Sequence, residues 1–190
     1  MGDPVPDCAW YVAYGSNLRY ERLMAYLQGA GSGPYGAHAG ARDRRPPRQA
    51  RSIRFDRGVY FAGDSRRWGG PVAFVELTPG ERTSFGRAYL LGWEQVVDVA
   101  SQENDEVAPL PIDRLPSPMA YIELPTQGKY NALLRLEDLD GAPAVTLTTA
   151  RSLRRGTPTP AYAAVIEQGL GEMDEISPAE IHRYMVRLLG

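Results

Sequence analysis

A short apolar run followed at once by a glycine turn and a helical pattern restricts this chain more than any other feature. The run AWYVAY, residues 9–14, predicts a strand, and Gly15-Ser16-Asn17 ends it. A helix is expected next, with Asn17 as its N-cap and Gly29 just beyond its end. The apolar face of that helix would be formed by Tyr20, Met24 and Leu27.

The turn between this strand and helix is a candidate anion site. Glycine at position 15 can take backbone conformations that are closed to other residues. The amides that follow belong to a first helical turn, where they have no partner within the helix. Such amides suit an anion or a developing oxyanion. The same residues also fit a plain strand-to-helix turn with a capping Asn17, and both interpretations stay open at this point.

The later segments predict a mixed α+β fold in one domain that spans residues 1–190. Further strands are expected at residues 52–55, 59–62, 71–77 and 86–91, and a helix at 93–101. A hairpin would join residues 130–136 to 144–149. Two capped helices would follow, one over 162–170 and one after the capping box Ser177-Pro178-Ala179-Glu180. Residues 29–49 and 109–125 lack periodicity and predict irregular structure.

The scarcity of histidine and cysteine limits the chemistry open to the chain. His38 and His182 are the only histidines, and Cys8 is the only cysteine. A zinc site or a histidine-based triad would need nearly all of them. We therefore expect carboxylates, tyrosines and backbone amides to do any catalysis, without a metal or a cofactor. A single cysteine excludes an internal disulfide and favours a reducing, cytoplasmic location.

The charge and the apolar segments give no reason to expect a nucleic acid or a membrane as partner. The formal net charge is −2, and the basic run RDRRPPR, residues 42–48, fits a solvated loop. No apolar run is as long as a transmembrane helix. The first seven residues lack the apolar core of a signal peptide.

Six short motifs, in the same order along the chain, resemble those of the gamma-glutamylcyclotransferase family. VAYGSNL resembles the strand and substrate loop with which the family opens. WGG followed by PVAFVELTPG, and then GRAYLLGW, resemble the next strands. ASQEN resembles the helix end that carries the family's catalytic glutamate, GKYNALLRL the strand after it, and PTPAY the start of a late helix. The resemblance implies the family's fold, a mixed β-barrel or sheet flanked by helices.

The resemblance also implies an intramolecular reaction on a small γ-glutamyl compound. The α-amine of the substrate would attack its own γ-carbonyl, which gives 5-oxoproline and a free amine, and Glu103 would move the protons. The other implied site residues would bind the substrate, and they are Tyr14, Gly15, Ser16, Asn17, Leu18, Trp68, Tyr130 and Tyr162. The sequence does not specify the amine half of the substrate, and it leaves a homodimer open.

Other interpretations of these residues remain. Glu103 lies in an acidic stretch that a solvated helix end would share, and tyrosine and tryptophan are common in cores. The same pocket could instead hydrolyse or transfer an amide. A non-catalytic binding module is a third hypothesis, and it should lack a glutamate that faces the glycine loop.

The chain also departs from the family pattern in two respects. Asn104 follows Glu103, where the family usually has glycine. The segments 29–49 and 105–126 are longer than in small members, and extra loops near a pocket usually change substrate choice.

Overall fold

A six-stranded mixed sheet forms the centre of the protein. The structure is a computed structural model that describes residues 3–31 and 36–190. The strands of the sheet, in spatial order, are β3 (Gln49–Phe55), β6 (Ser84–Gly92), β2 (Cys8–Ala13), β10 (Ala144–Thr148), β9 (Ala132–Arg135) and β8 (Tyr121–Glu123). Neighbouring strands are antiparallel except β2 and β10, which run parallel. Among the described residues the outer strands β3 and β8 do not pair with each other, so the sheet is open and is not a closed barrel.

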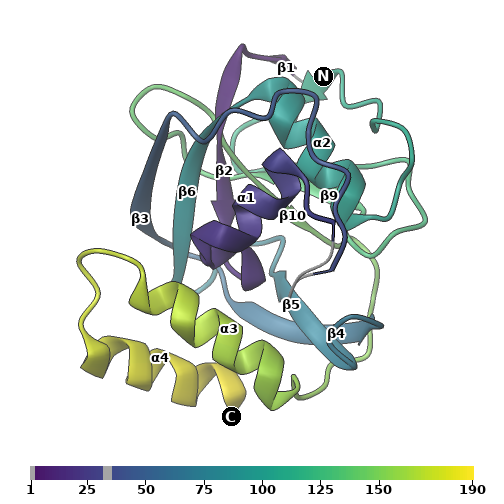
Figure 1. The fold of residues 1–190 in the computed structure, drawn as a ribbon. Coiled ribbons are helices and arrows are strands. Elements are labelled where there is room, and N and C mark those ends of the chain that lie inside the picture. The colour runs from purple at the N-terminus through teal and green to yellow at the C-terminus, as the bar shows by residue number, and fades with distance from the viewer. Residues whose placement is uncertain (1–2, 32–35) are drawn as a thin grey trace.

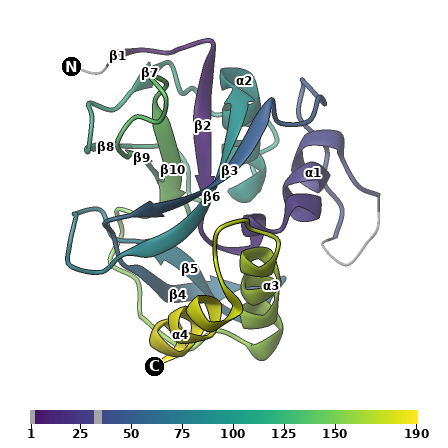
Figure 2. The ribbon, with the colours of Figure 1, turned by 90° about the vertical axis from the view of Figure 1, so that its left-hand side faces the viewer.

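Strand β2 is covered on both faces, which explains why its sequence is apolar throughout. Side chains alternate across a strand: Trp10 and Val12 belong to one apolar cluster, and Tyr11 and Ala13 to another. The first cluster includes side chains from α3 (Pro160–Gly171) and α4 (Pro178–Leu189). The second includes side chains from α1 (Tyr20–Gln28) and α2 (Trp93–Glu103). Figures 1 and 2 show α3 and α4 side by side, below α1 and α2.

The two C-terminal helices begin as their capping residues predict. Thr159 caps α3, where its Oγ1 accepts a hydrogen bond from the Tyr162 amide at 3.3 Å and Pro160 takes the first helical position. Ser177 and Glu180 form the expected capping box at the start of α4. The predicted helix after residue 92 is also confirmed, as α2.

The helix α1 starts later than the sequence indicates. A 3₁₀ turn, η1 (Ser16–Leu18), follows β2, and α1 begins at Tyr20 with Arg19 as its N-cap. Asn17 is therefore not the cap of α1. Its side chain points instead to Tyr11 and Glu103, to which it donates hydrogen bonds. Gly29 ends α1 with a φ of 84°, as its position predicts.

A separate hairpin, β4 (Val59–Ser65) and β5 (Gly70–Val75), packs beside the central sheet. The link between them is the buried Thr148 of β10, whose Oγ1 accepts from the amide of Val75 at 3.1 Å and donates to its carbonyl at 2.6 Å. The predicted hairpin of β9 and β10 is confirmed.

The two segments predicted to be irregular differ from each other. Two short strands interrupt residues 109–125: β8, and β7 (Arg114–Leu115), which pairs with β1 (Asp3–Pro4). Strands this short carry no periodic signal, so no pattern of residues indicates them. Residues 32–35 of the segment 29–49 lie outside the described residues, and the rest of it has only an isolated bridge, between Ala30 and His38, before β3 begins at Gln49. In the part of the chain that the structure describes, no helix is long and apolar enough to cross a membrane.

Candidate functional site

The candidate site begins just after β2 ends, at Gly15. A Cβ atom added at Gly15 would lie 2.9 Å from the hydroxyl oxygen of Tyr162 and 3.4 Å from Cβ of Ala73. Its φ is −111°, which is negative, so the position needs glycine for space and not for a left-handed backbone. The Tyr162 hydroxyl accepts a hydrogen bond from the Ala73 amide at 3.2 Å. The loop, α3 and β5 therefore meet at this hydroxyl.

The 3₁₀ turn after Gly15 uses one of the amides that the sequence analysis assigned to an anion. The Leu18 amide donates to the Gly15 carbonyl at 3.0 Å, and the Leu18 side chain is fully buried in the core. Tyr89 donates to the carbonyls of both Asn17 and Leu18. Leu18 therefore holds the turn in place and lies outside the cavity lining.

Glu103 is the last residue of α2, and its carboxylate faces the glycine loop. Its Oε1 accepts a hydrogen bond from Nδ2 of Asn17 at 2.7 Å. The same Nδ2 lies 3.2 Å from the hydroxyl of Tyr11. Asn17 is buried and Glu103 is half-buried. The contact joins residues 86 positions apart in the sequence, and it places a carboxylate beside the loop.

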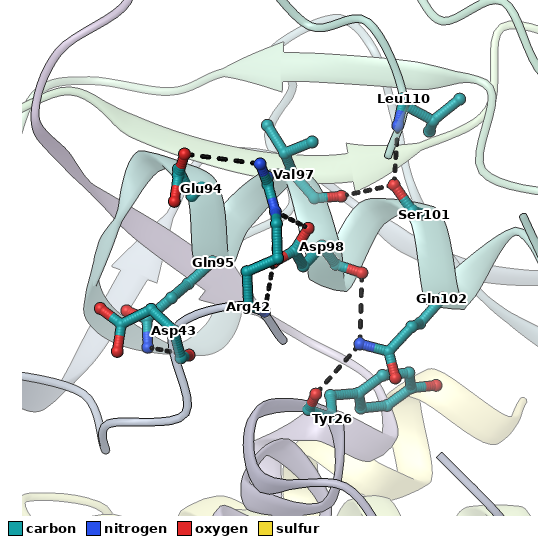
Figure 3. Close-up of polar contacts among 10 residues, drawn as sticks. All are labelled: Tyr26, Arg42, Asp43, Glu94, Gln95, Val97, Asp98, Ser101, Gln102 and Leu110. Carbon is teal, nitrogen blue, oxygen red and sulfur yellow. Dashed lines mark hydrogen bonds and ion pairs between the residues drawn. The ribbon is translucent and has the colours of Figure 1, made fainter. Parts of the chain in front are cut away.

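Polar contacts along α2 hold the end that carries Glu103 (Figure 3). The buried Asp98 carboxylate accepts from the amide and Nε of Arg42, at 2.8 and 3.0 Å. Near the start of the helix, Gln95 donates to the carbonyl of Asp43 at 3.0 Å. Next to Glu103, the Gln102 amide donates to the carbonyl of Tyr26 at 3.0 Å. The end of α2 is thus tied to the end of α1 and to the segment before β3.

Two adjoining cavities meet at the Glu103 carboxylate. The inner chamber has a volume of about 30 Å³, and the outer cavity about 620 Å³. Four residues line both: Ser16, Glu103, Tyr130 and Tyr162. Of the other residues expected at the site, Tyr14, Gly15 and Asn17 line the inner chamber and Trp68 lines the outer cavity. The fold therefore brings together every expected site residue except Leu18.

Burial keeps the tyrosines of the site neutral. Burial raises the pKa of Tyr162 to about 12, and the Glu103 charge contributes in the same direction although the Ala73 amide opposes it. Burial, and after it the Glu103 charge, raises the pKa of Tyr11 far above its ordinary value. The pKa of Tyr130 is raised well above 10.0, again mainly by burial. At neutral pH these hydroxyls therefore stay protonated and do not act as bases.

The Tyr14 hydroxyl has a structural partner. It donates to the carbonyl of Leu147 in β10, and burial raises its pKa well above 10.0. Tyr14 therefore contributes its ring to the wall of the inner chamber, while its hydroxyl connects β2 to β10.

A buried arginine, Arg22, forms part of the outer wall and was not singled out from the sequence. Its Nε donates to Oγ of Ser16 at 2.8 Å, and its Nη2 donates to the hydroxyl of Tyr26 at 3.0 Å. The guanidinium lies 5.3 Å from the Tyr26 ring centre and 5.5 Å from that of Trp68. Arg22 and Tyr26 are four residues apart on α1 and so share one face. The sequence signal that could have identified Arg22 is a charged residue on the buried face of an amphipathic helix.

Many of the other lining residues that the sequence analysis missed are polar or charged. The outer cavity also contains Asp64, Arg66, Arg67, Gln102, Asp105 and Lys129, and the inner chamber contains Tyr11. Most of them lie in the β4–β5 turn or next to residues that were predicted, so only the fold reveals that they share a cavity.

Solved structures with a similar fold include a gamma-glutamyl cyclotransferase. It matches with a TM-score of 0.57 and 16% identity, over 95% of this chain and 88% of that chain. The uncharacterized protein loc79017 from Homo sapiens matches with a TM-score of 0.58 and 16% identity, over 96% of this chain and 89% of that one. YkqA from Bacillus subtilis matches with a TM-score of 0.51 and 16% identity, over 96% of this chain and 56% of YkqA. The chain therefore has the gamma-glutamyl cyclotransferase fold.

The sequence comparisons add one curated relative. Histone deacetylase 5 of Arabidopsis thaliana is 27% identical over an aligned length of 198 residues. The alignment covers 93% of this chain. The chain spans about 30% of the length of that protein, so most of the plant protein lies outside the match. No protein-family model matches the chain.

Proposed function

We propose that this protein is a cofactor-independent gamma-glutamylcyclotransferase that releases 5-oxoproline and an amine from a γ-glutamyl amide. The observation that carries the proposal is the Glu103 carboxylate, which faces the glycine loop at the junction of the two cavities. The hypothesis of a non-catalytic binding module predicted that a glutamate facing the glycine loop would be absent. The gamma-glutamyl cyclotransferase fold supports the same reaction class, by analogy.

The reaction needs little more than folding of the substrate and transfer of protons. The α-amine attacks the γ-carbonyl of the same molecule, the new C–N bond closes a five-membered ring, and the original amide C–N bond breaks. Two protons leave the attacking nitrogen and two reach the departing nitrogen, so no co-reactant is consumed. Because the nucleophile is tethered, holding the substrate in an attack geometry supplies a large part of the acceleration.

Glu103 is the group that moves these protons. It is the only carboxylate among the described residues that line the inner chamber, and the raised pKa values of Tyr162 and Tyr11 make those hydroxyls unsuitable as bases near neutral pH. The carboxylate takes a proton from the ammonium and later gives one to the leaving amine. The Asn17 amide, 2.7 Å away, fixes the orientation of the carboxylate.

The developing oxyanion is stabilised by neutral donors. The Tyr162 hydroxyl already accepts from the Ala73 amide, so its own proton is available to a second oxygen. Backbone amides in the loop that starts at Gly15 provide further donors. The amine half occupies the outer cavity, whose volume of about 620 Å³ falls in the range typical of ligand pockets.

The test is 5-oxoproline release from a panel of γ-glutamyl amino acids and amines, with wild type compared with Glu103→Gln. The near-isosteric change removes the base, and we expect release to fall by about 10²- to 10⁴-fold. Glu94→Gln is the matched control, because Glu94 lies on the same helix and its side chain is 69% exposed. Equal turnover by wild type and Glu103→Gln would contradict the role of Glu103.

The identity of the product separates the proposal from its alternatives. Free glutamate in place of 5-oxoproline would show that the pocket hydrolyses amides, which is the second candidate reaction. Transfer would join the glutamyl group to an added amine. Binding of the panel compounds without any product would indicate the non-catalytic module.

A further inference from the structure

Asn104, the residue that follows Glu103, bridges the end of α2 to the segment that carries Tyr130. Its Nδ2 donates to the Ala100 carbonyl and to the Tyr130 carbonyl, both at 3.0 Å. Its Oδ1 accepts from the Tyr130 amide at 2.8 Å. The side chain is buried. Both of its hydrogen bonds to Tyr130 are made with the main chain of that residue. We call this set of contacts the Asn104 bridge.

A glycine completes the Asn104 bridge from the opposite side. A Cβ atom at Gly128 would lie 2.2 Å from Oδ1 of Asn104 and 2.5 Å from its Cβ. No side chain fits there unless Asn104 moves. Gly128 and Asn104 therefore occupy one packed contact, with the Tyr130 backbone beside it.

The segment that the Asn104 bridge holds forms a wall of the candidate site. Tyr130 lines both cavities, and Lys129 lines the outer one. The Tyr130 ring packs 5.1 Å from that of Phe74, so its place depends both on this ring contact and on its own backbone. The Asn104 bridge fixes the backbone of Tyr130, and Asn104 is the residue next to Glu103.

We propose that Asn104 is a positioning residue, which holds the Lys129–Tyr130 wall at a set distance from the Glu103 carboxylate and so keeps the substrate in its attack geometry. The inference rests on the proposed cyclotransferase function for its kinetic consequence, but not for the contact itself. It also explains how this chain accommodates Asn104 where the resembling family usually has glycine. The larger residue replaces the flexibility of glycine with a side chain that is bonded on both sides.

Two variants near the end of α2 separate positioning from general stability. Asn104→Ala removes the bridge, whereas Ser101→Ala removes a different buried contact of α2, in which Ser101 Oγ accepts from the Leu110 amide at 2.9 Å (Figure 3). Ser101 and Leu110 do not line either cavity. We expect kcat/KM for 5-oxoproline release to fall about 10- to 100-fold in Asn104→Ala, and to change little in Ser101→Ala.

Amide hydrogen exchange gives a second readout that does not depend on activity. The Tyr130 amide should exchange faster in Asn104→Ala and at the wild-type rate in Ser101→Ala. If wild type releases no 5-oxoproline, the proposed function fails, while hydrogen exchange still decides whether Asn104 holds Tyr130. Unchanged exchange at Tyr130, or equal kinetic losses in the two variants, would overturn the inference.

Gly128→Ala tests the same contact from its other side. The added methyl group meets Asn104 Oδ1, so we expect this variant alone to lose activity and Tyr130 protection as Asn104→Ala does. Because that methyl group also lies 2.5 Å from Cβ of Asn104, the partner substitution is Asn104→Gly, and in this double variant the methyl group enters space that Asn104 no longer fills. The combined loss should therefore be clearly smaller than the product of the two single losses; independent effects would contradict the bridge.

Discussion

Gly15→Ala tests whether space alone explains the glycine at the head of the candidate site. The new methyl carbon would lie 2.9 Å from the Tyr162 hydroxyl oxygen and 3.4 Å from Cβ of Ala73. Tyr162 is only 1% exposed, and its hydroxyl is held by the Ala73 amide at 3.2 Å. The hydroxyl cannot move away from the methyl group without loosening that hydrogen bond.

The expected cost follows from this geometry. Overpacking a buried contact typically costs about 1–3 kcal/mol, and we take about 2 kcal/mol for one methyl group against one hydroxyl. For a chain of this length, each kcal/mol lowers the melting temperature by about 2–4 °C. Gly15→Ala should therefore melt about 4–8 °C below wild type.

A double-mutant cycle with Tyr162→Phe identifies the cause. Tyr162→Phe alone removes the acceptor of the Ala73 amide and should cost about 1–3 kcal/mol. In the double variant the methyl group added at position 15 would occupy space that the hydroxyl has left. The loss of unfolding free energy in the double variant should then be clearly smaller than the sum of the two single losses, with a coupling free energy of about 1–2 kcal/mol.

Urea unfolding of the four proteins measures this coupling, with equal m-values as the check that the transitions are comparable. Additive losses would refute the steric explanation. A Gly15→Ala protein as stable as wild type would refute it as well.

Two further predictions concern stability away from the cavity. Thr148→Val keeps the shape of the side chain but leaves the amide and the carbonyl of Val75 without their partner. Urea unfolding should therefore show a loss of unfolding free energy of about 2 kcal/mol or more. A loss below about 0.5 kcal/mol would contradict the role of Thr148 in joining the hairpin to the sheet. Hydrogen bonds from the Ser177 amide and hydroxyl, with Arg54, lower the pKa of Glu180 from 4.5 to about 2. A lowered pKa stabilises the folded protein above the unfolded value and loses this effect as the pH falls from about 4.5 toward 2. The melting temperature of Glu180→Gln should therefore fall less steeply than that of wild type over this acid range, and parallel curves would contradict the assignment.

Local patterns predicted most of the elements correctly. The strand at β2, the glycine after α1 and the caps of α3 and α4 are each determined by neighbouring residues, so their signals are present in short stretches of sequence. The position of Asn17 was predicted less well, because a capping asparagine and an asparagine in a 3₁₀ turn have the same local sequence. What distinguishes them is Glu103, which is 86 residues away.

The cavity was predicted only in part, for the same reason. The order of short motifs identified Glu103 and the loop, although no single stretch shows that they meet. Arg22 was missed because its role depends on Ser16, Tyr26 and Trp68, and the last of these comes from the β4–β5 turn. Gly15 was assigned a conformational reason, and the structure adds a steric one, the Tyr162 hydroxyl, which no local pattern places beside it.

The electrostatics of the inner chamber make two questions about this protein separable. Glu103 is the only carboxylate among its described lining residues, and burial raises the pKa values of Tyr11, Tyr130 and Tyr162. Within the inner chamber Glu103 is therefore the candidate base near neutral pH, whether the attacking group is the amine of the substrate or a water molecule. Loss of turnover in Glu103→Gln therefore tests the site, and the choice between 5-oxoproline and glutamate tests the reaction. If Glu103→Gln loses activity and wild type yields glutamate, the assignment of Glu103 as the base stands and only the assignment of cyclisation is wrong.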